Sequence, residues 1–176
     1  MKFFNNVISY IKDTDIYIPK INFLERFLEK ALIMKELHSI QNSFRNATTL
    51  QFYTDGSVVN IRKELMSMSL AFYQNHFSAL TARFKATLEH FSSSTYAKTA
   101  AVLAALLTAP TDCQVDIFTD SKSTIDHALF TCLTTCLFFK EENNIIWSMI
   151  RQIIKDNNLH VTFHKVKAHS NNYAND

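Results

Sequence analysis

The chain has 176 residues, of which 47% are hydrophobic and 19% charged, and its formal net charge is +2. This length suits one domain with a substantial core, and the composition excludes an intrinsically disordered chain. The small net charge excludes a polycation but leaves room for a local basic face. Three cysteines, an odd number, argue against a disulfide framework. No segment is apolar enough for a signal peptide or a membrane-spanning helix, so we expect a soluble protein in the cytoplasm or nucleus.

Residues 1–48 are expected to form a helical arm and a linker ahead of a domain over residues 49–176. Asn22 and Glu25 have the spacing of an N-terminal capping pair. The pattern that follows predicts an amphipathic helix over 22–44 that packs on the domain or on a partner. Its apolar side begins with Leu24, Phe27, Leu28 and Ala31.

Three strands are expected next, as an antiparallel meander. The first covers residues 49–55 and is largely apolar. The second alternates apolar and polar side chains from Met66 to Ala71, and the third does so from Ala82 to Glu89. Alternation of this kind is typical of antiparallel strands with one face on a core.

The second half of the chain predicts helices alternating with single strands. Hydroxyl residues from Ser92 to Thr95 can cap a helix rich in alanine and leucine, which Pro110 would stop. The order β-β-β-α-β-α-α-β predicts a mixed sheet with helices, and we expect Trp147 to lie in the core. The expected elements are helices over 96–108, from about Ser123 and over 141–156, and strands over 114–119 and 159–165.

Two stretches end an apolar run with an aspartate followed by small residues. In Phe52-Tyr53-Thr54-Asp55-Gly56-Ser57 we expect a strand that ends in a sharp turn, with Asp55 at its last position. Gly56 is the only glycine, so it should serve either a positive φ or a close approach to a ligand. Phe118-Thr119-Asp120-Ser121 repeats the design. Aspartates at the ends of two neighbouring strands can share a divalent metal ion.

These motifs resemble, in order and spacing, landmarks of the type 1 ribonuclease H family. Ser93-Ser94-Thr95 and Lys165-Val166-Lys167-Ala168-His169-Ser170 complete the series, and the resemblance covers about residues 49–176. It implies an RNase H-like α/β fold with a mixed five-stranded sheet in the order 3-2-1-4-5 and helices on both faces. It also implies hydrolysis of the RNA strand of an RNA–DNA hybrid with two Mg²⁺ ions. A helical segment upstream of such a domain is similar to the arrangement in retroelement polyproteins.

The resemblance also assigns roles to single residues. Asp55 and Asp120 correspond to the first and third of the family's four catalytic, metal-binding acids, and His169 to its mobile-loop histidine. Residues 61–100 contain five bases and only two acids, and this basic charge would contact phosphates, although a solvated polar strand face would show the same pattern. The bases are Arg62, Lys63, Arg83, Lys85 and Lys98. The residues expected to contact nucleic acid are Gly56, Ser57, Ser121, Arg83, Lys85 and Lys167.

Two of the family's four acids have no counterpart. Lys98 corresponds to the second acid, a glutamate, and the fourth is expected beyond Asp176. Asp55, Asp120 and Lys98 together carry a charge of −1, so we expect Lys98 to pair with the aspartates where a metal ion would otherwise lie. Cleavage should then be weak or absent. Three functions stay open: a ribonuclease H-type endonuclease, a non-catalytic nucleic-acid-binding module, and a degenerate retroelement fragment.

Overall fold

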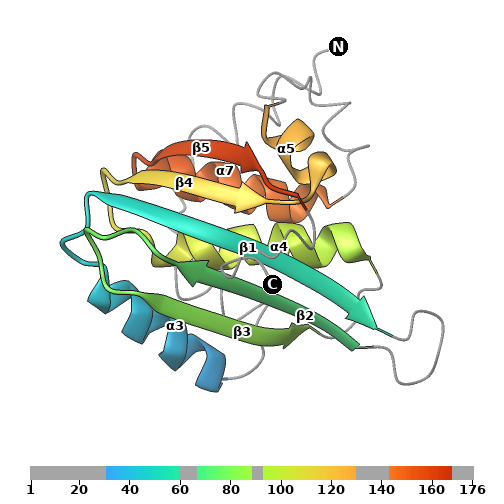
Figure 1. Ribbon diagram of the computed structural model, residues 1–176, viewed down its shortest axis with the longest axis horizontal. Coiled ribbons are helices and arrows are strands. Elements are labelled where there is room, and N and C mark those ends of the chain that lie inside the picture. Colours follow the sequence, from blue (N-terminus) through green and yellow to red (C-terminus); the bar gives the residue numbers. More distant parts are fainter. Residues whose placement is uncertain (1–30, 60–66, 89–92, 130–142, 168–176) are drawn as a thin grey trace, which may run out of the picture. The chain divides into compact units, whose positions relative to one another are not determined.

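The computed structural model describes residues 31–59, 67–88, 93–129 and 143–167, drawn as helices, strands and connecting loops in Figure 1. The chain divides into two compact units, one before and one after the boundary between Met34 and Lys35. The larger unit, which begins at Lys35, contains all the contacts reported below. None of the helices in these four ranges is long and apolar enough to cross a membrane.

Helix α3 (Ala31–Ser43) is the described part of the helix predicted over 22–44. The earlier part, with Leu24, Phe27 and Leu28, lies outside the described residues. Leu37, at 2% exposure, and Phe44, at 0%, are buried, and the side-chain amide of Gln41 donates a hydrogen bond to the Leu107 carbonyl at 3.2 Å. The compact unit therefore begins earlier in the chain than the boundary predicted after residue 48.

Five strands form one mixed sheet in the order β3-β2-β1-β4-β5. β1 pairs antiparallel with β2, and β2 with β3, whereas β1 pairs parallel with β4, and β4 with β5. The predicted strand order is confirmed. The strands are β1 (Thr49–Val59), β2 (Ser67–Gln74), β3 (Ala82–Leu88), β4 (Gln114–Thr119) and β5 (His160–Lys165).

β1 differs from its prediction at its C-terminal end. The expected sharp turn after Asp55 is wrong, because the strand runs on to Val59. β2 supplies antiparallel partners along this extension, among them Ala71 opposite Asp55. Pairing of β1 with β4, in contrast, stops at Tyr53 opposite Phe118. Asp55 therefore lies just beyond the end of one ladder and within the other.

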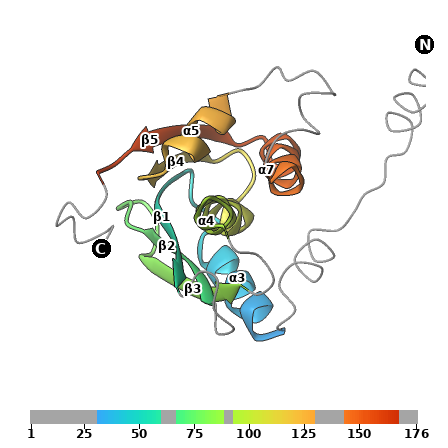
Figure 2. The same cartoon turned by 90° about the vertical axis from the view of Figure 1, so that its right-hand side faces the viewer.

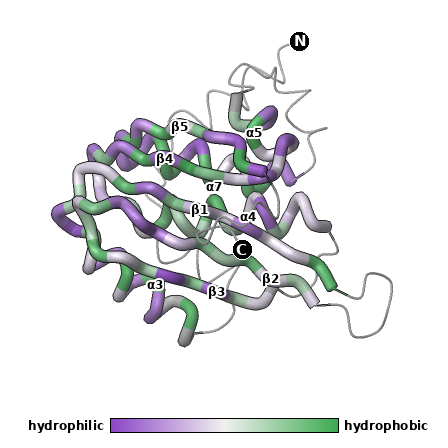
Figure 3. Tube along the Cα trace, in the orientation of Figure 1, coloured by the Kyte–Doolittle hydropathy of each residue, from purple (hydrophilic) through white to green (hydrophobic). Residues whose placement is uncertain are grey.

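The sheet has two unlike faces. Leu50, Phe52 and Thr54 of β1 are buried, whereas the side chains between them are half-buried and Asp55 is exposed. The same alternation runs along β2 and β4, and in Figure 3 hydrophobic and polar positions interchange along the strands. We call the buried side the covered face and the other side the exposed face. The covered face carries Leu50, Phe52, Met68, Leu70, Phe72, Phe84, Ala86, Val115 and Ile117.

Helices α4 (Ser94–Thr108) and α7 (Asn144–Asp156) lie side by side along one face of the sheet (Figures 1 and 2). Ser93 caps α4 by accepting a hydrogen bond from the Tyr96 amide at 3.3 Å, and the helix ends before Pro110, as predicted. Trp147 of α7 is 2% exposed, which confirms its place in the core. Helices on the second face stay a prediction.

Candidate functional site

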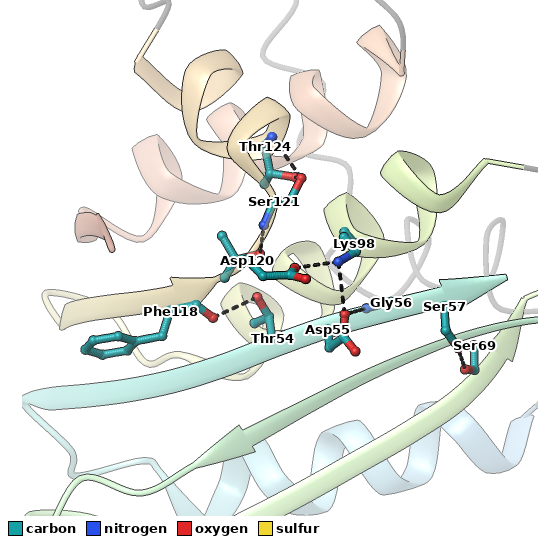
Figure 4. Close-up of polar contacts among 11 residues, drawn as sticks. Thr54, Asp55, Gly56, Ser57, Ser69, Lys98, Phe118, Asp120, Ser121 and Thr124 are labelled. Carbon is teal, nitrogen blue, oxygen red and sulfur yellow. Dashed lines mark hydrogen bonds and ion pairs between the residues drawn. The ribbon is translucent and has the colours of Figure 1, made fainter. Parts of the chain in front are cut away.

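Asp55 and Asp120 come from neighbouring parallel strands. The last β1–β4 pair is Tyr53 opposite Phe118, and each aspartate follows its strand's member of that pair by two residues. Parallel strands present their carboxyl ends at the same edge of a sheet, so both carboxylates reach one end of the molecule. Figure 4 shows them facing a common space beside α4. The prediction that the two aspartates meet at adjacent strands is confirmed.

Lys98 of α4 occupies the space between the two carboxylates. Its Nζ lies 2.5 Å from Asp120 Oδ1 and 3.4 Å from Asp55 Oδ1 (Figure 4). The side chains of Lys98 and Asp120 are 18% and 16% exposed, whereas that of Asp55 is 51% exposed. The lysine is therefore bonded tightly to the sheltered acid and more loosely to the exposed one. The expected pairing of Lys98 with the aspartates is confirmed.

This set of side chains does not fit a divalent metal ion. Two carboxylates and one ammonium leave a charge of −1, and the ammonium is bonded to the oxygens that Mg²⁺ would need. Among the residues that the structure describes, no group of three or more His, Cys, Asp or Glu side chains could hold a metal ion. The expectation of two Mg²⁺ ions rests on the family resemblance, and the observed geometry adds no support to it.

Gly56 explains how α4 comes so close to β1. Gly56 does not have a positive φ, so the predicted turn conformation is absent, and the group that approaches its backbone closely is the main chain of α4, where a ligand was expected. A Cβ atom at this position would lie 2.3 Å from the Ala97 carbonyl carbon and 2.4 Å from the Lys98 nitrogen. The Gly56 amide also donates to Asp55 Oδ1 at 2.7 Å. Gly56 is buried, so little of it is accessible, and the nucleic-acid contact expected there stays a prediction.

Ser121 also has an internal role. It is 8% exposed, and its hydroxyl accepts hydrogen bonds from the Thr124 amide at 3.2 Å and the Thr124 hydroxyl at 2.8 Å. Ser121 thereby caps helix α5 (Lys122–Leu129) immediately after Asp120. A serine three residues before a threonine at a strand-to-helix junction was the signal for this cap. The Ser121 hydroxyl is therefore engaged within the chain, and the nucleic-acid contact expected there stays a prediction.

The other predicted contact residues remain accessible. Lys85 lies in the same cross-strand row as Asp55, with Ala71 between them, so both belong to the exposed face. Ser57 lies two residues after Asp55 on the same face of β1, and its hydroxyl shares a 2.8 Å hydrogen bond with that of Ser69 on β2. Arg83 is exposed and lies over the Tyr73 ring at 5.0 Å. Lys167 is exposed, whereas His169 lies outside the described residues.

One feature of the exposed face was missed by sequence reasoning. The rings of Tyr53 and Phe118 are stacked with centroids 4.7 Å apart, and Phe118 and His164 repeat that spacing. His164 Nε2 also lies 2.8 Å from Asp116 Oδ1. Alternation alone could assign each ring to a face of its strand. Only the register of β1, β4 and β5 shows that the three rings form one stack.

Comparisons with solved structures support the fold. A foamy viral protease-reverse transcriptase, solved with double-stranded DNA, is 19% identical with a TM-score of 0.50, covering 74% of this chain and 91% of its own. LC9-RNase H1 is 17% identical with a TM-score of 0.55, and the match covers 73% of this chain and 69% of LC9-RNase H1. RNase H1 from the halophilic archaeon Halobacterium salinarum NRC-1 is 14% identical with a TM-score of 0.53, covering 72% and 91%. These identities establish the fold alone.

The sequence itself was compared with families and with individual proteins. No curated protein matches it. The RNase H family profile, however, matches residues 47–176, which is most of the chain and includes the sheet, α4 and both aspartates. Together with the strand order and the paired aspartates at the sheet end, this match shows that the chain belongs to the RNase H family.

Proposed function

We propose that this chain binds RNA–DNA hybrid at the edge of the sheet that carries Asp55 and Asp120, and that it cleaves the hybrid weakly or not at all. The observation that carries the proposal is the Lys98 ammonium, 2.5 Å from Asp120 and 3.4 Å from Asp55. Metal-dependent phosphodiester hydrolysis needs carboxylates that are free to hold the ions. Here the ammonium supplies the compensating charge instead.

Hybrid binding is supported by the family and by the charge near the site. Lys85 lies in the cross-strand row of Asp55, and Arg83 is its neighbour on the same face of β3. Lysine and arginine contacts to phosphates supply much of the affinity for nucleic acids and make binding salt-dependent. A structure of the foamy viral protease-reverse transcriptase with an RNA/DNA hybrid also resembles this fold, at 18% identity and a TM-score of 0.51.

The chemistry left to this chain is the binding and orientation of phosphate groups. Lys98 can donate to a phosphate oxygen that approaches from the side of Asp55, because that ion pair is the longer and more exposed one. Asp120, sheltered beside the lysine, would hold the ammonium in place. Lys98 would then be a single cationic contact to the nucleic-acid backbone within a group of three side chains whose charge is −1, and it would not activate water.

The test measures binding and cleavage separately on a labelled RNA–DNA duplex. We expect salt-dependent binding by fluorescence anisotropy and negligible cleavage at millimolar Mg²⁺, with and without EDTA. Lys85→Gln should weaken binding and reduce the slope of log K against log salt by about 1. Metal-dependent cleavage by the unmodified chain would contradict the catalytic part of the proposal. Binding that is absent, or unchanged by salt, would contradict the rest.

A lysine exchange sharpens the test of the metal site. Lys98→Glu replaces the ammonium by a carboxylate and changes the charge of the three side chains from −1 to −3. Mg²⁺ should then bind measurably in calorimetry, whereas Lys98→Gln, the matched control, removes the ammonium without adding a ligand charge. Equal Mg²⁺ affinities of wild type and Lys98→Gln would show that the Lys98 ammonium does not exclude the metal ion, and equal affinities of the two variants would show that the added carboxylate is not a ligand.

A further inference from the structure

The contact between β1 and α4 at Gly56 is closer than any side chain would allow. A Cβ atom there would lie 2.3, 2.4 and 2.6 Å from the Ala97 carbonyl carbon, the Lys98 nitrogen and the Ala97 carbonyl oxygen. All three atoms belong to the main chain of α4, so no side-chain rotation could relieve the clash. Ordinary contacts between carbon atoms are about 3.5 Å or more, so the helix would have to move by roughly 1 Å.

Lys98 is the residue that such a movement would displace. Its backbone nitrogen is one of the three atoms against Gly56, and its side chain leaves the helix toward Asp120 and Asp55 (Figure 4). Asp55 precedes Gly56 in β1, and its Oδ1 accepts from the Gly56 amide. The same strand segment therefore carries one partner of the lysine and sets the distance of the helix that carries the lysine.

The two ion pairs should respond unequally to a shift of α4. The pair with Asp55 is already 3.4 Å long and half-exposed, so about 1 Å more would break it. The pair with Asp120, at 2.5 Å, can lengthen and still persist. A loss of this kind would free the ammonium toward solvent on the side of Asp55.

We propose that Gly56 is a positioning residue of this site: by letting α4 touch β1, it holds Lys98 between Asp55 and Asp120. The inference rests on the proposed role of Lys98 as the internal cation. Gly56 itself makes no contact with a ligand and acts only through the lysine. A residue that merely supported the core would lower stability without changing Lys98 selectively.

The first experiment measures the accessibility of each lysine. Wild type and Gly56→Ala are acylated briefly with an amine-reactive reagent, and the rate at each lysine is determined by mass spectrometry. Lys85 and Lys122, both exposed, serve as internal standards. In Gly56→Ala we expect Lys98 to react about threefold faster relative to these standards, the factor that corresponds to one exposed ion pair. An unchanged ratio would overturn the proposal.

A matched variant separates positioning from general destabilisation. Ile150→Val removes one methyl group from α7 at a residue that is 1% exposed and does not belong to the β1–α4 contact. It should lower the melting temperature but leave the Lys98 ratio at the wild-type value. If it raises that ratio as much as Gly56→Ala does, Gly56 has no special role. Should Gly56→Ala fail to fold, Ala97→Ser adds one atom to the fully buried side chain of the residue whose carbonyl group faces Gly56, and the same ratio decides.

The second experiment is a double-mutant cycle on hybrid binding. If Gly56 acts through Lys98, Gly56→Ala changes the dissociation constant in the wild-type background and not in the Lys98→Gln background. Equal changes in both backgrounds would overturn the proposal. The acylation ratio does not depend on nucleic acid, so it tests Gly56 even if hybrid binding itself is not found.

Discussion

The covered and exposed faces of the sheet are built from alternate residues of the same strands, yet they serve different ends. On the covered face Phe52 lies edge-on to both Phe44 and Phe72, at 6.1 and 5.4 Å, and all three are buried. On the exposed face Tyr53 and Phe118 stack on each other but remain half-buried. Adjacent residues of β1 therefore differ in burial because successive side chains point to opposite faces.

The difference shows where this fold can carry a site. Side chains of the covered face are held by packing and give the domain its stability. The exposed face has charges that can meet a ligand, such as Lys85 in the row of Asp55. Lys98 joins the two, because it comes from a helix packed on the sheet and reaches an aspartate of the exposed face. The site lies where the helix layer meets β1 just beyond its pairing with β4.

The largest expected effect breaks the covered face. Phe52→Ala removes a ring that is 0% exposed, and we expect it to lower the free energy of unfolding by about 3–5 kcal/mol. Tyr53→Ala, one residue on, should cost only about 1 kcal/mol because its ring is half-buried. Urea denaturation followed by circular dichroism measures both values. Equal losses would mean that the exposed face is as tightly packed as the covered one.

A smaller effect is expected where the two faces meet. Lys98→Gln removes the ammonium from both carboxylates and should lower the free energy of unfolding by about 1–2 kcal/mol, mostly through Asp120. The Asp55 pair contributes little of this because half of that side chain is exposed to water. Lys85→Gln on the exposed face is the control and should change stability by less than about 0.5 kcal/mol. A larger loss for Lys85→Gln would reverse the comparison.

The buried thiol of Cys113 makes the free energy of unfolding depend on pH. Burial raises the pKa of the Cys113 thiol from 9.0 to about 11, since the charged thiolate is disfavoured away from water. The folded state therefore keeps its proton at pH values where the unfolded chain has lost it. Stability is fully present below pH 9 and falls as the pH rises toward 11, by about 1 kcal/mol between pH 8 and pH 10. Burial also raises the pKa of Tyr96, so denaturation at both pH values should show a loss in both proteins that is larger in wild type than in Cys113→Ala.

The smallest effect concerns the ion pair on the exposed face. His164 and Asp116 lie 2.8 Å apart with side chains that are 40% and 27% exposed. His164→Gln should change the free energy of unfolding by about 0.5 kcal/mol or less, because water screens a pair of this kind. Thermal melting at pH 6 and pH 8 provides the measurement. If the free energy of unfolding fell by more than about 2 kcal/mol, the stacked rings of Tyr53, Phe118 and His164 would have to belong to a packed core.

Local patterns in the sequence were enough to predict most of the elements. Alternation along 82–89 and the apolar run at 114–119 correspond to β3 and β4, since side chains two residues apart share a face of a strand. Helix α4 begins after the capping Ser93 and ends before Pro110, and both ends lie within two residues of the predicted ones. The strand order and the meeting of Asp55 with Asp120 followed from the family resemblance rather than from these patterns.

Other features depended on contacts between distant segments. The length of β1 is decided by β2, whose antiparallel pairing continues past Asp55 where a turn was expected. Gly56 was expected to serve a turn or the approach of a ligand, and only the position of α4 shows that it makes room for a helix instead. The hydroxyl of Ser121 caps α5, so it is not presented at the surface.

The sequence by itself determined that this chain carries two aspartates that each follow an apolar run, and the family resemblance assigns Lys98 to the position of the family's second acid. The tertiary structure decided what that lysine does. Its distances of 2.5 and 3.4 Å to the two carboxylates depend on how closely α4 approaches the sheet. That approach is set by the one residue of β1 that lacks a side chain, packed against residues more than forty positions later in the chain. Spacing along the chain cannot encode such a distance, because it arises only when the helix and the strand are packed together.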